Sequence, residues 1–386
     1  MRNTLMRQQK SESMKIFDCL QRRGHEQVSF FNDEDTGLRG IIAIHDTTLG
    51  PALGGCRMWN YGSEEEALMD VLRLSRAMTY KAAVAGLNLG GGKAVILGNS
   101  KTDKTEMLFR AFGRFIEGLG GRYITAEDVG TTIEDMEMVR METSFVTGFS
   151  RTLGGGGDPS PVTAKGVFYG IQACAKHRFD KDSINGMSVA IQGLGHVGME
   201  LAKLLHGAGV ELHVADLDQE LVDLAVKNYG AKAVSVNDIH KVDVDIFAPC
   251  ALGAVINDDT INELKCSIVA GAANNQLDST DLHGGKLNDM GILYAPDYVI
   301  NSGGLINAAN AFEGDHQRRA FQQAEGIYDT LMRIFTFADK EGVPTNRASD
   351  YIAEERLRQA SKLKKIYKPG LWGREYYAKM RQTSRS

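Results

Sequence analysis

The chain has 386 residues, which is room for two or three domains at roughly 100–200 residues each. Apolar residues make up 43% of it and charged residues 24%, the composition of an ordinary globular protein. The 44 Lys and Arg and the 49 Asp and Glu leave a net charge of −5 and form no basic block, which argues against a dedicated nucleic-acid binder. No apolar run reaches the ~18 residues that a membrane-spanning helix needs.

The cysteines argue against both a disulfide framework and a thiolate zinc site. Their number is odd, and no two lie within four residues of each other (Cys19, Cys56, Cys174, Cys250 and Cys266). The first dozen residues are polar and lack the apolar core of a secretion signal. No two histidines have the spacing of metal ligands. We therefore expect a cytoplasmic protein without a metal.

The first 150 residues mix strands and helices. Two β-branched and aromatic runs, 27–32 and 38–45, flank a turn-rich segment and predict a hairpin. Ser63 and Glu66 form a capping box that predicts the start of a helix. Four apolar residues of this helix recur at the spacing of one buried face (Ala67, Val71, Leu74 and Met78).

Past this helix, short strands and helices are expected to alternate up to about residue 150. A Gly-Gly-Gly-Lys turn ends at Lys93 and precedes a short strand at 94–97. We then expect a helix that buries Leu108 and Phe112, a strand at 122–125, and a helix that begins at Thr132.

The segment 153–161 predicts a linker or hinge, because it holds four glycines and two prolines. Beyond it strands and helices alternate, which predicts a parallel, doubly wound sheet. Strands are expected at 188–192, 211–215, 243–248, 267–270 and 291–294. Long helices at about 315–340 and 345–364 close the chain.

A glycine-rich turn after the strand 188–192 predicts a dinucleotide site. Gly193 allows a tight turn, Gly195 lets a pyrophosphate approach the backbone, and Gly198 lets the following helix pack on the strand. The pyrophosphate would lie on unpaired amides at the positive end of that helix. The turn as a whole consists of Gly193, Leu194, Gly195, His196, Val197 and Gly198.

The end of the next strand indicates which dinucleotide binds. Asp216 lies 18 residues beyond Gly198 and would accept hydrogen bonds from the adenosine ribose. Asp218 adds negative charge, and no Lys or Arg lies between Asp216 and Glu220. A 2′-phosphate would be repelled there, so we expect NAD rather than NADP.

Three charged residues of the first part suggest proton chemistry. Lys93 follows three glycines, so its stem would be enclosed by backbone and its amine partly desolvated, which favours the neutral form of a general base. A neighbouring Lys81 would favour that form further by repulsion. Asp128 follows the strand 122–125 and could carry protons between substrate and water.

These residues belong to stretches that resemble the glutamate/leucine/phenylalanine/valine dehydrogenase superfamily, and most closely its members that act on leucine. The similar stretches are 43–55, 86–93, 123–130, 249–253, 271–276 and 297–304. The resemblance covers nearly the whole chain after about residue 14. It implies reversible oxidative deamination, in which an L-amino acid, NAD⁺ and water give a 2-oxo acid, NADH and ammonium.

The resemblance also implies a role for individual residues. Lys93 would be the catalytic base, Asp128 would assist its proton transfers, and Lys81 would hold the substrate carboxylate with Gly54 nearby. Along the cofactor would lie Thr163, Ala251, Leu252, Asn274 and, contacting the substrate as well, Asn275. The substrate side chain would contact Leu53, Ala126, Leu305 and Ala308.

This pocket is apolar, so a carboxylate or amine on the substrate side chain would be left unpaired in it. Branched aliphatic side chains fit best, which predicts leucine, with valine and isoleucine, as the substrate. Members that act on leucine often carry alanine where this chain has Gly92, and valine where it has Leu305 and Ala308. A preference for valine, phenylalanine or tryptophan therefore stays open. Two other classes fit the sequence less well. A 2-hydroxy-acid dehydrogenase would require a catalytic histidine, and a non-catalytic NAD-binding regulator would be expected to lack Lys93 or Asp128.

The expected fold class is thus α/β with two domains. Residues 1–150 and 336–386 would form an N-terminal α/β domain for substrate binding, catalysis and oligomerisation, and 151–335 a Rossmann-type NAD-binding domain. We expect a homo-oligomer whose only other partners are the amino acid, the 2-oxo acid and ammonium, with no nucleic acid and no membrane. The aromatic residues of the tail would contact another subunit (Trp372, Tyr376 and Tyr377).

Overall fold

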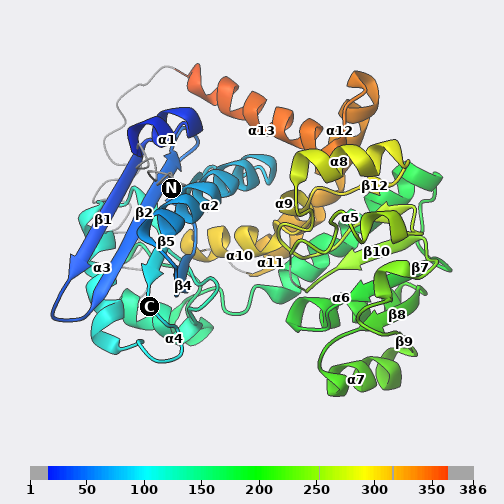
Figure 1. Ribbon diagram of the computed structural model, residues 1–386, viewed down its shortest axis with the longest axis horizontal. Coiled ribbons are helices and arrows are strands. Elements are labelled where there is room, and N and C mark those ends of the chain that lie inside the picture. The colour runs from blue at the N-terminus through cyan, green and yellow to red at the C-terminus, as the bar shows by residue number, and fades with distance from the viewer. Residues whose placement is uncertain (1–15, 252, 315–316, 364–386) are drawn as a thin grey trace, which may run out of the picture.

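The computed structural model describes residues 16–251, 253–314 and 317–363. It consists of two lobes, each built around its own sheet, with helix α10 (Gly303–Phe312) between them (Figure 1). The chain termini, including Trp372, Tyr376 and Tyr377, lie outside the described residues. Among the helices that are described, none is long and apolar enough to cross a bilayer.

The sheet of the first lobe is mixed. Its strands are β1 (Gln27–Asp33), β2 (Leu38–Asp46), β3 (Ala52–Leu53), β4 (Cys56–Trp59), β5 (Gly90–Leu97) and β6 (Tyr123–Ile124). They are ordered β1-β2-β5-β3-β6, and β4 pairs with β5. The helices of this lobe are α1 (Ile16–Arg23), α2 (Glu64–Val84), α3 (Glu106–Gly118) and α4 (Ile133–Arg140). β3 pairs in parallel with both β5 and β6, so Leu53 at the end of β3 lies between Gly91 of β5 and Ile124 of β6.

The hairpin and the helix starts of this lobe are confirmed. β1 and β2 pair antiparallel from Gln27 with Ile44 to Asp33 with Leu38. The Ser63 hydroxyl accepts a hydrogen bond from the Glu66 amide and caps α2. The reciprocal half of the expected capping box differs, because the Glu66 carboxylate accepts from the Gly62 amide instead.

Two structural predictions from the sequence of this lobe are wrong. The glycine–lysine stretch is not a turn: β5 begins at Gly90, so Lys93 lies inside the strand, paired with Ala43 of β2. Three glycines can lie in a strand where neighbouring backbone approaches closely, as it does here. Leu74 and Met78 are also only partly buried, because α2 turns a neighbouring flank, with Leu72, Ser75 and Thr79, into the lobe.

The second lobe has the expected parallel, doubly wound sheet. Its strands are β7 (Ser188–Gln192), β8 (Glu211–Ala215), β9 (Lys232–Ala233), β10 (Ile246–Pro249), β11 (Ile268–Val269) and β12 (Leu293–Tyr294). All pair in parallel in the order β12-β11-β10-β7-β8-β9. The strand order reverses between β7 and β10, the place where such sheets bind ligands. The covering helices are α5 (Ser160–Phe179), α6 (His196–Gly207), α7 (Gln219–Tyr229) and α8 (Thr280–Asp289).

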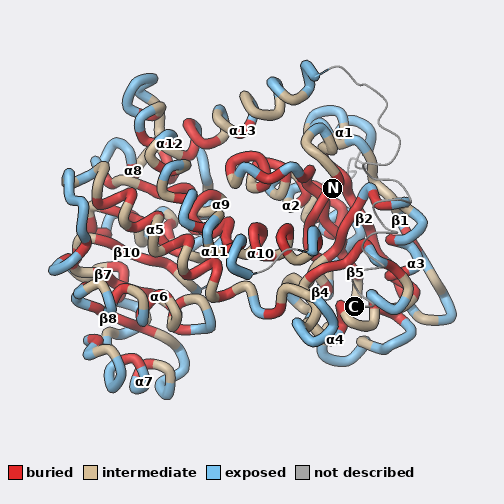
Figure 2. Tube along the Cα trace, turned by 180° about the vertical axis from the view of Figure 1, so that it is seen from behind, coloured by how far each residue is buried: buried red, intermediate tan, exposed pale blue. Residues whose placement is uncertain are grey.

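The C-terminal helices connect the lobes. They are α9 (Asp297–Ile300), α10, α11 (Gln317–Glu325), α12 (Ile327–Glu341) and α13 (Thr345–Ser361). The single long helix expected at 315–340 is instead α11 and α12, divided at Gly326, because glycine weakens a helix interior. α13 packs back on α2, where Tyr80 donates to Glu354 and Arg356 donates to the Ala83 carbonyl. One continuous hydrophobic cluster joins both lobes, and α10 is largely buried within it (Figure 2).

Candidate active site

Lys93 and Asp128 form a largely buried ion pair at the edge of the first lobe. The Lys93 Nζ lies 3.1 Å from the Asp128 Oδ2, and only 6% of the lysine side chain is exposed. Burial alone would raise the pKa of Asp128, but Lys93 and Arg57 outweigh it and lower that pKa below its usual value. Asp128 is therefore a carboxylate at neutral pH and holds the lysine amine in place.

Close approach of strands brings this pair together. A Cβ at Gly54 would lie 1.8 Å from the Gly92 carbonyl oxygen, so β3 and β5 could not pair as they do with a side chain there. A Cβ at Gly92 would lie 2.7 Å from the Tyr123 ring, and the Tyr123 hydroxyl donates to the Gly54 carbonyl at 2.6 Å. The tyrosine occupies the space that an alanine at position 92 would need, which explains the glycine of this chain.

Lys81 lies in the last turn of α2 and is only partly exposed. Burial lowers its pKa to about 8; Asp297 opposes that shift and Lys93 reinforces it. Asp297 belongs to α9 of the second lobe and Lys93 to the first, so charged groups of both lobes affect the pKa of Lys81. Below about pH 8 the group is an ammonium that can hold a carboxylate.

A second cation, Arg57, contacts Asp128, and the sequence did not predict this contact. The Arg57 Nε lies 3.1 Å from Asp128 Oδ2, and the Arg57 Nη1 lies 2.8 Å from Asp70 Oδ2. Asp70 also accepts from Arg73, whose Nη1 lies 3.5 Å from Asn275 Oδ1 of the second lobe. The alternation of β4 places Cys56 inward and Arg57 outward, but no local pattern indicates which carboxylates the arginine meets.

The carboxyl group of Glu127, next to Asp128 in the chain, lies in an environment that disfavours its charged form. Its Oε2 is buried without a hydrogen-bond partner. Burial, with Asp158 and Glu134, raises its pKa to about 7. The folded protein thus holds this proton more tightly than the unfolded chain, so the associated stability is present below about pH 4.5 and lost as the pH rises through about 7.

Replacing Glu127 by glutamine should remove that pH dependence. We expect Glu127→Gln to be more stable than the wild type by about 1 kcal/mol at about pH 8, a value reduced for the partial exposure of the group. Near pH 4.5 the two proteins should unfold at the same denaturant concentration. Urea unfolding at both pH values checks this, and an equal difference at both would contradict it.

The glycine turn of the second lobe leaves open space in front of the first turn of α6. Gly193 has φ +96°, a conformation that favours glycine, and a Cβ at Gly198 would lie 2.0 Å from the Gly193 carbonyl oxygen. At Gly195, in contrast, no atom lies within 4 Å of where a Cβ would be. Gly195 is the N-cap of the 12-residue helix α6 and no side chain caps its first amides. Open space in front of unpaired amides fits the pyrophosphate of a dinucleotide.

The remaining residues expected along a cofactor surround this turn. Asp216 accepts from the Leu194 amide at 2.5 Å and the Asp218 amide at 2.9 Å, and a carboxylate has further acceptor positions for a ribose. Ala251 packs on Gly193, while His196 is 87% exposed. Val197 is partly buried on α6, and Leu252 lies outside the described residues.

The loops after β11 and the start of α10 complete this edge. The Asn301 amide donates to Asn274 Oδ1, and Asn275 has a strained φ of +50°. Thr163 of α5 is buried where α10 begins, beside Gly304. Thr163 itself donates to the Pro159 carbonyl.

The side-chain pocket expected from the sequence spans both lobes. Leu53 follows Ala52 in β3 and is buried, and Ala126, after β6, is partly buried. Leu305 and Ala308 lie on α10, and the Ala308 carbonyl accepts from Thr147 of the first lobe. The Thr147 amide also donates to the Thr125 carbonyl, so Thr147 joins α10 to the strand end that precedes Ala126 and Asp128.

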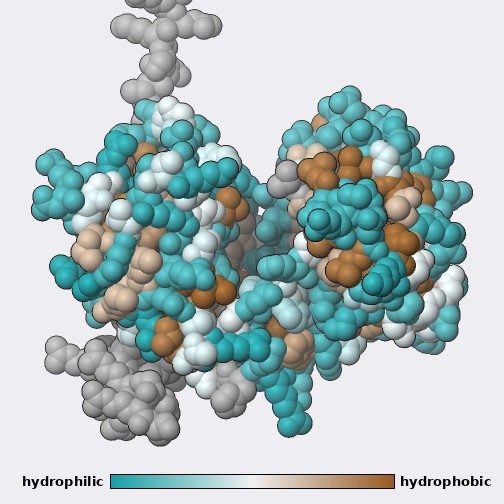
Figure 3. Space-filling view, turned by 90° about the horizontal axis from the view of Figure 1, so that it is seen from below, coloured by the Kyte–Doolittle hydropathy of each residue, from teal (hydrophilic) through white to brown (hydrophobic). Residues whose placement is uncertain are grey.

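A deep hollow separates the lobes in the space-filling view (Figure 3). Arg73 of the first lobe lies 3.5 Å from Asn275 of the second, and Asp297 of the second lobe affects the pKa of Lys81 in the first, so the two lobes approach each other at these residues. A lobe with a Rossmann-type parallel sheet, joined to a lobe that holds a buried lysine–aspartate pair, is the architecture of a two-domain dehydrogenase. Among the described residues, no cluster of histidine, cysteine and acidic side chains is placed to hold a metal.

Comparison with known proteins agrees with this class. The model for the Glu/Leu/Phe/Val dehydrogenase dimerisation domain matches residues 25–145, and the Glutamate/Leucine/Phenylalanine/Valine dehydrogenase model matches 154–222 and 212–362. The chain is 54% identical to leucine dehydrogenase of Thermoactinomyces intermedius over 92% of this chain and 96% of that protein. It is similar to the crystal structure of L-tryptophan dehydrogenase from Nostoc punctiforme, with TM-score 0.81 and 47% identity over 90% of this chain and 99% of that one.

A hetero-hexameric glutamate dehydrogenase from Thermus thermophilus shares the fold alone, at 22% identity and TM-score 0.72 over 89% of this chain and 91% of that one. The chain belongs to the Glu/Leu/Phe/Val dehydrogenase family and is an amino-acid dehydrogenase. The expected two-domain α/β class is thereby confirmed.

Proposed function

We propose that this enzyme carries out the reversible, NAD-dependent oxidative deamination of leucine, and of valine and isoleucine less efficiently. The observation that supports it most is the buried Lys93–Asp128 pair. A leucine dehydrogenase that is 54% identical supports the substrate. The balanced reaction is amino acid, NAD⁺ and water giving 2-oxo acid, NADH, ammonium and a proton.

The residues of the first lobe divide the work of this reaction. Lys81, as an ammonium, would pair with the substrate carboxylate. Lys93 would take a proton from the water that attacks the oxidised substrate carbon and later return a proton to the leaving nitrogen. Asp128 would hold the Lys93 amine in place and stabilise its charged form. Closure of the hollow between the lobes would exclude bulk water during these steps.

The second lobe would hold the dinucleotide. When bound, NAD⁺ accepts the hydride from the substrate α-carbon. Gly195 and the free amides of α6 would receive the pyrophosphate, and Asp216 the adenosine ribose. Thr163, Ala251 and Asn274 would lie along the nicotinamide half, with Asn275 also contacting the substrate. The carboxylates of Asp216 and Asp218 would repel a 2′-phosphate, which supports NAD over NADP.

The substrate preference would come from the apolar pocket. Leu53 and Leu305 are nearly fully buried, and neither they nor Ala126 and Ala308 carry a group that could pair with a charged substrate end. A glutamate side chain would bring an unpaired charge into this pocket. One methylene more or less is worth only about 1–3 kcal/mol, so leucine, isoleucine and valine should all react. Curated relatives that act on tryptophan and phenylalanine, at 48% identity, make aromatic substrates the second candidate.

A panel of amino acids tests the function. NADH formation is measured with leucine, isoleucine, valine, phenylalanine, tryptophan, glutamate and leucine's hydroxy-acid analogue, each with NAD⁺ and NADP⁺. The highest kcat/KM is expected with leucine and NAD⁺, and the reverse reaction is expected to require ammonium. Turnover of the hydroxy acid alone, or of no aliphatic amino acid, would reject the proposal.

The pKa of Lys81 predicts how carboxylate binding changes with pH. The dissociation constant of 4-methylpentanoate, an unreactive leucine analogue, should be flat below about pH 8 and rise about tenfold per pH unit above it, as Lys81 loses its charge. Calorimetry across that range provides the measurement. Lys81→Arg keeps its charge at every accessible pH, so its binding should be weaker but flat. A rise that persists in Lys81→Arg would assign the dependence to another group.

The organisation of the chain supports three coarser proposals. We propose the domain limits of 1–150 with 336–386, and 151–335, although α12 runs through the second limit. The match to a dimerisation domain supports a homo-oligomer, and all five cysteines are free, which fits a reducing cytoplasm.

A further inference from the structure

Arg57 occupies a bridging position behind the reacting pair. Its Nε lies 3.1 Å from Asp128 Oδ2, the same oxygen that Lys93 Nζ approaches at 3.1 Å. The Asp128 oxygen that pairs with the lysine is thus also held by the arginine. Without that contact the carboxylate could rotate, and the lysine amine would lose its fixed partner.

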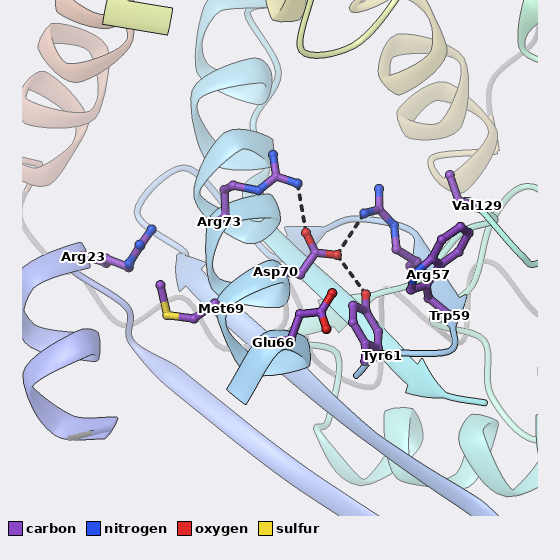
Figure 4. Close-up of a pocket in the computed structure, with 9 residues that line it drawn as sticks. All are labelled: Arg23, Arg57, Trp59, Tyr61, Glu66, Met69, Asp70, Arg73 and Val129. Carbon is purple, nitrogen blue, oxygen red and sulfur yellow. Dashed lines mark hydrogen bonds and ion pairs between the residues drawn. The ribbon is translucent and has the colours of Figure 1, made fainter. Parts of the chain in front are cut away.

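Asp70 in turn holds Arg57. Its Oδ2 accepts from Arg57 Nη1 at 2.8 Å and from the Tyr61 hydroxyl at 2.8 Å, and its Oδ1 accepts from Arg73 at 2.9 Å. Figure 4 shows Asp70 at the centre of these three donors. Burial would raise the pKa of Asp70, but Arg57, Tyr61 and Arg73 keep it below its usual value, so the group stays charged.

An open cavity explains why Arg57 needs this support. A cavity of about 500 Å³ lies against the arginine and is also lined by Trp59, Tyr61, Asp70 and Arg73 (Figure 4). The Arg57 side chain is 21% exposed, so packing does not enclose it on that side. A guanidinium has a planar fork that can bind two carboxylates at once, which a lysine amine does less well. The two aspartates therefore determine where the arginine lies.

We propose that Arg57 and Asp70 are positioning residues of the deamination reaction, which fix the Asp128 carboxylate against the Lys93 amine without contacting the substrate. This rests on the proposed function, because it assigns Lys93 as the base. Asp70 acts on the Asp128–Lys93 pair only through Arg57, since its other arginine partner, Arg73, is directed to Asn275 instead. This order of action distinguishes a positioning role from a general contribution to folding.

A double-mutant cycle tests the order. Arg57→Met should lower kcat by roughly 10- to 100-fold, because a displaced catalytic group is costly even at small distances. Asp70→Asn should lower kcat about threefold to tenfold in the wild-type background and not at all in the Arg57→Met background, because coupled residues are non-additive. KM for leucine and the dissociation constant of NADH should stay within about twofold in each variant. The isotope effect with leucine deuterated at the α-carbon is recorded alongside, and it should change in Arg57→Met if proton transfer has become slower than hydride transfer.

Glu142→Gln is the matched control. Glu142 is buried to the same degree as Asp70, at 14% and 15% side-chain exposure, and also binds two arginines, Arg110 and Arg114. It should lose comparable stability and keep wild-type kcat. Equal losses of kcat from Asp70→Asn in both backgrounds, an unchanged kcat in Arg57→Met, or an equal loss in Glu142→Gln would overturn the proposal. Should Arg57→Met fail to fold, Arg57→Lys takes its place. Wild-type turnover tests the proposed function separately, since the ratios are taken with whichever amino acid the wild type accepts.

Discussion

Replacing Lys93 by alanine should lower kcat for deamination by about 10²- to 10⁴-fold, the range that a positioned proton-transfer group contributes. The amine is the only part of the side chain that reaches Asp128, and 6% exposure of that side chain leaves little room for water to replace it. NADH binding should be unchanged, because the glycine turn lies in the other lobe. Stopped-flow turnover and NADH fluorescence titration measure the two quantities.

A second lysine–aspartate pair of the first lobe provides the control. Lys104 and Asp135 are in contact at 2.5 Å, with 24% and 7% of their side chains exposed. Lys104→Ala should reduce stability and leave kcat intact. If Lys93→Ala turned over normally, or if both variants lost kcat equally, Lys93 would not be the base.

Gly195→Ala should weaken NADH binding by about 100-fold while the protein keeps its stability. No atom lies within 4 Å of the added methyl group, and the backbone at φ −60° and ψ −170° accepts alanine without strain. The methyl group would instead occupy the space in front of the α6 amides. Loss of two hydrogen bonds to phosphate, at roughly 1.5 kcal/mol each, corresponds to about that factor.

Two other glycines of the same helix separate binding from folding. Gly207 ends α6 and also has open space around its Cβ position, so Gly207→Ala should leave both NADH affinity and stability near wild type. Gly198→Ala should destabilise the fold, because its methyl group would lie 2.0 Å from the Gly193 carbonyl oxygen. Calorimetry of NADH binding and thermal unfolding compare the three. Unchanged affinity in Gly195→Ala would remove the pyrophosphate from this turn.

Much of the second lobe could be predicted because its signals are local. The glycine turn, the strand before it and the aspartate after it stand at fixed offsets along the chain, and the alternation of strands and helices leaves few sheet arrangements. The hairpin and the helix caps at Ser63 and Thr132 are local in the same sense. The three-glycine stretch belongs to a strand and not to the expected turn, because glycine occurs where backbone approaches closely in strands as well as in turns.

The electrostatics of the site were less predictable. Arg57 and Asp128 are separated by 71 residues and meet because the residues before them, Cys56 and Glu127, pair in parallel in the folded chain. The cation that lowers the pKa of Asp128 from this side therefore has no signal in the local sequence. Glu127 is similar, since its raised pKa reflects burial near Asp158 at the start of the second lobe.

The amino-acid sequence by itself determined the family, the two α/β halves, and the candidate chemical groups Lys81, Lys93, Asp128 and the glycine turn. These depend on residue type and short spacing, which are properties of the chain before it folds. Only the tertiary structure decided which charges surround those groups: Arg57 and Asp70 behind Asp128, and Asp297 opposite Lys81. Coulombic interactions depend on distance in space and on burial, and both are set when separate strands and the two lobes come together.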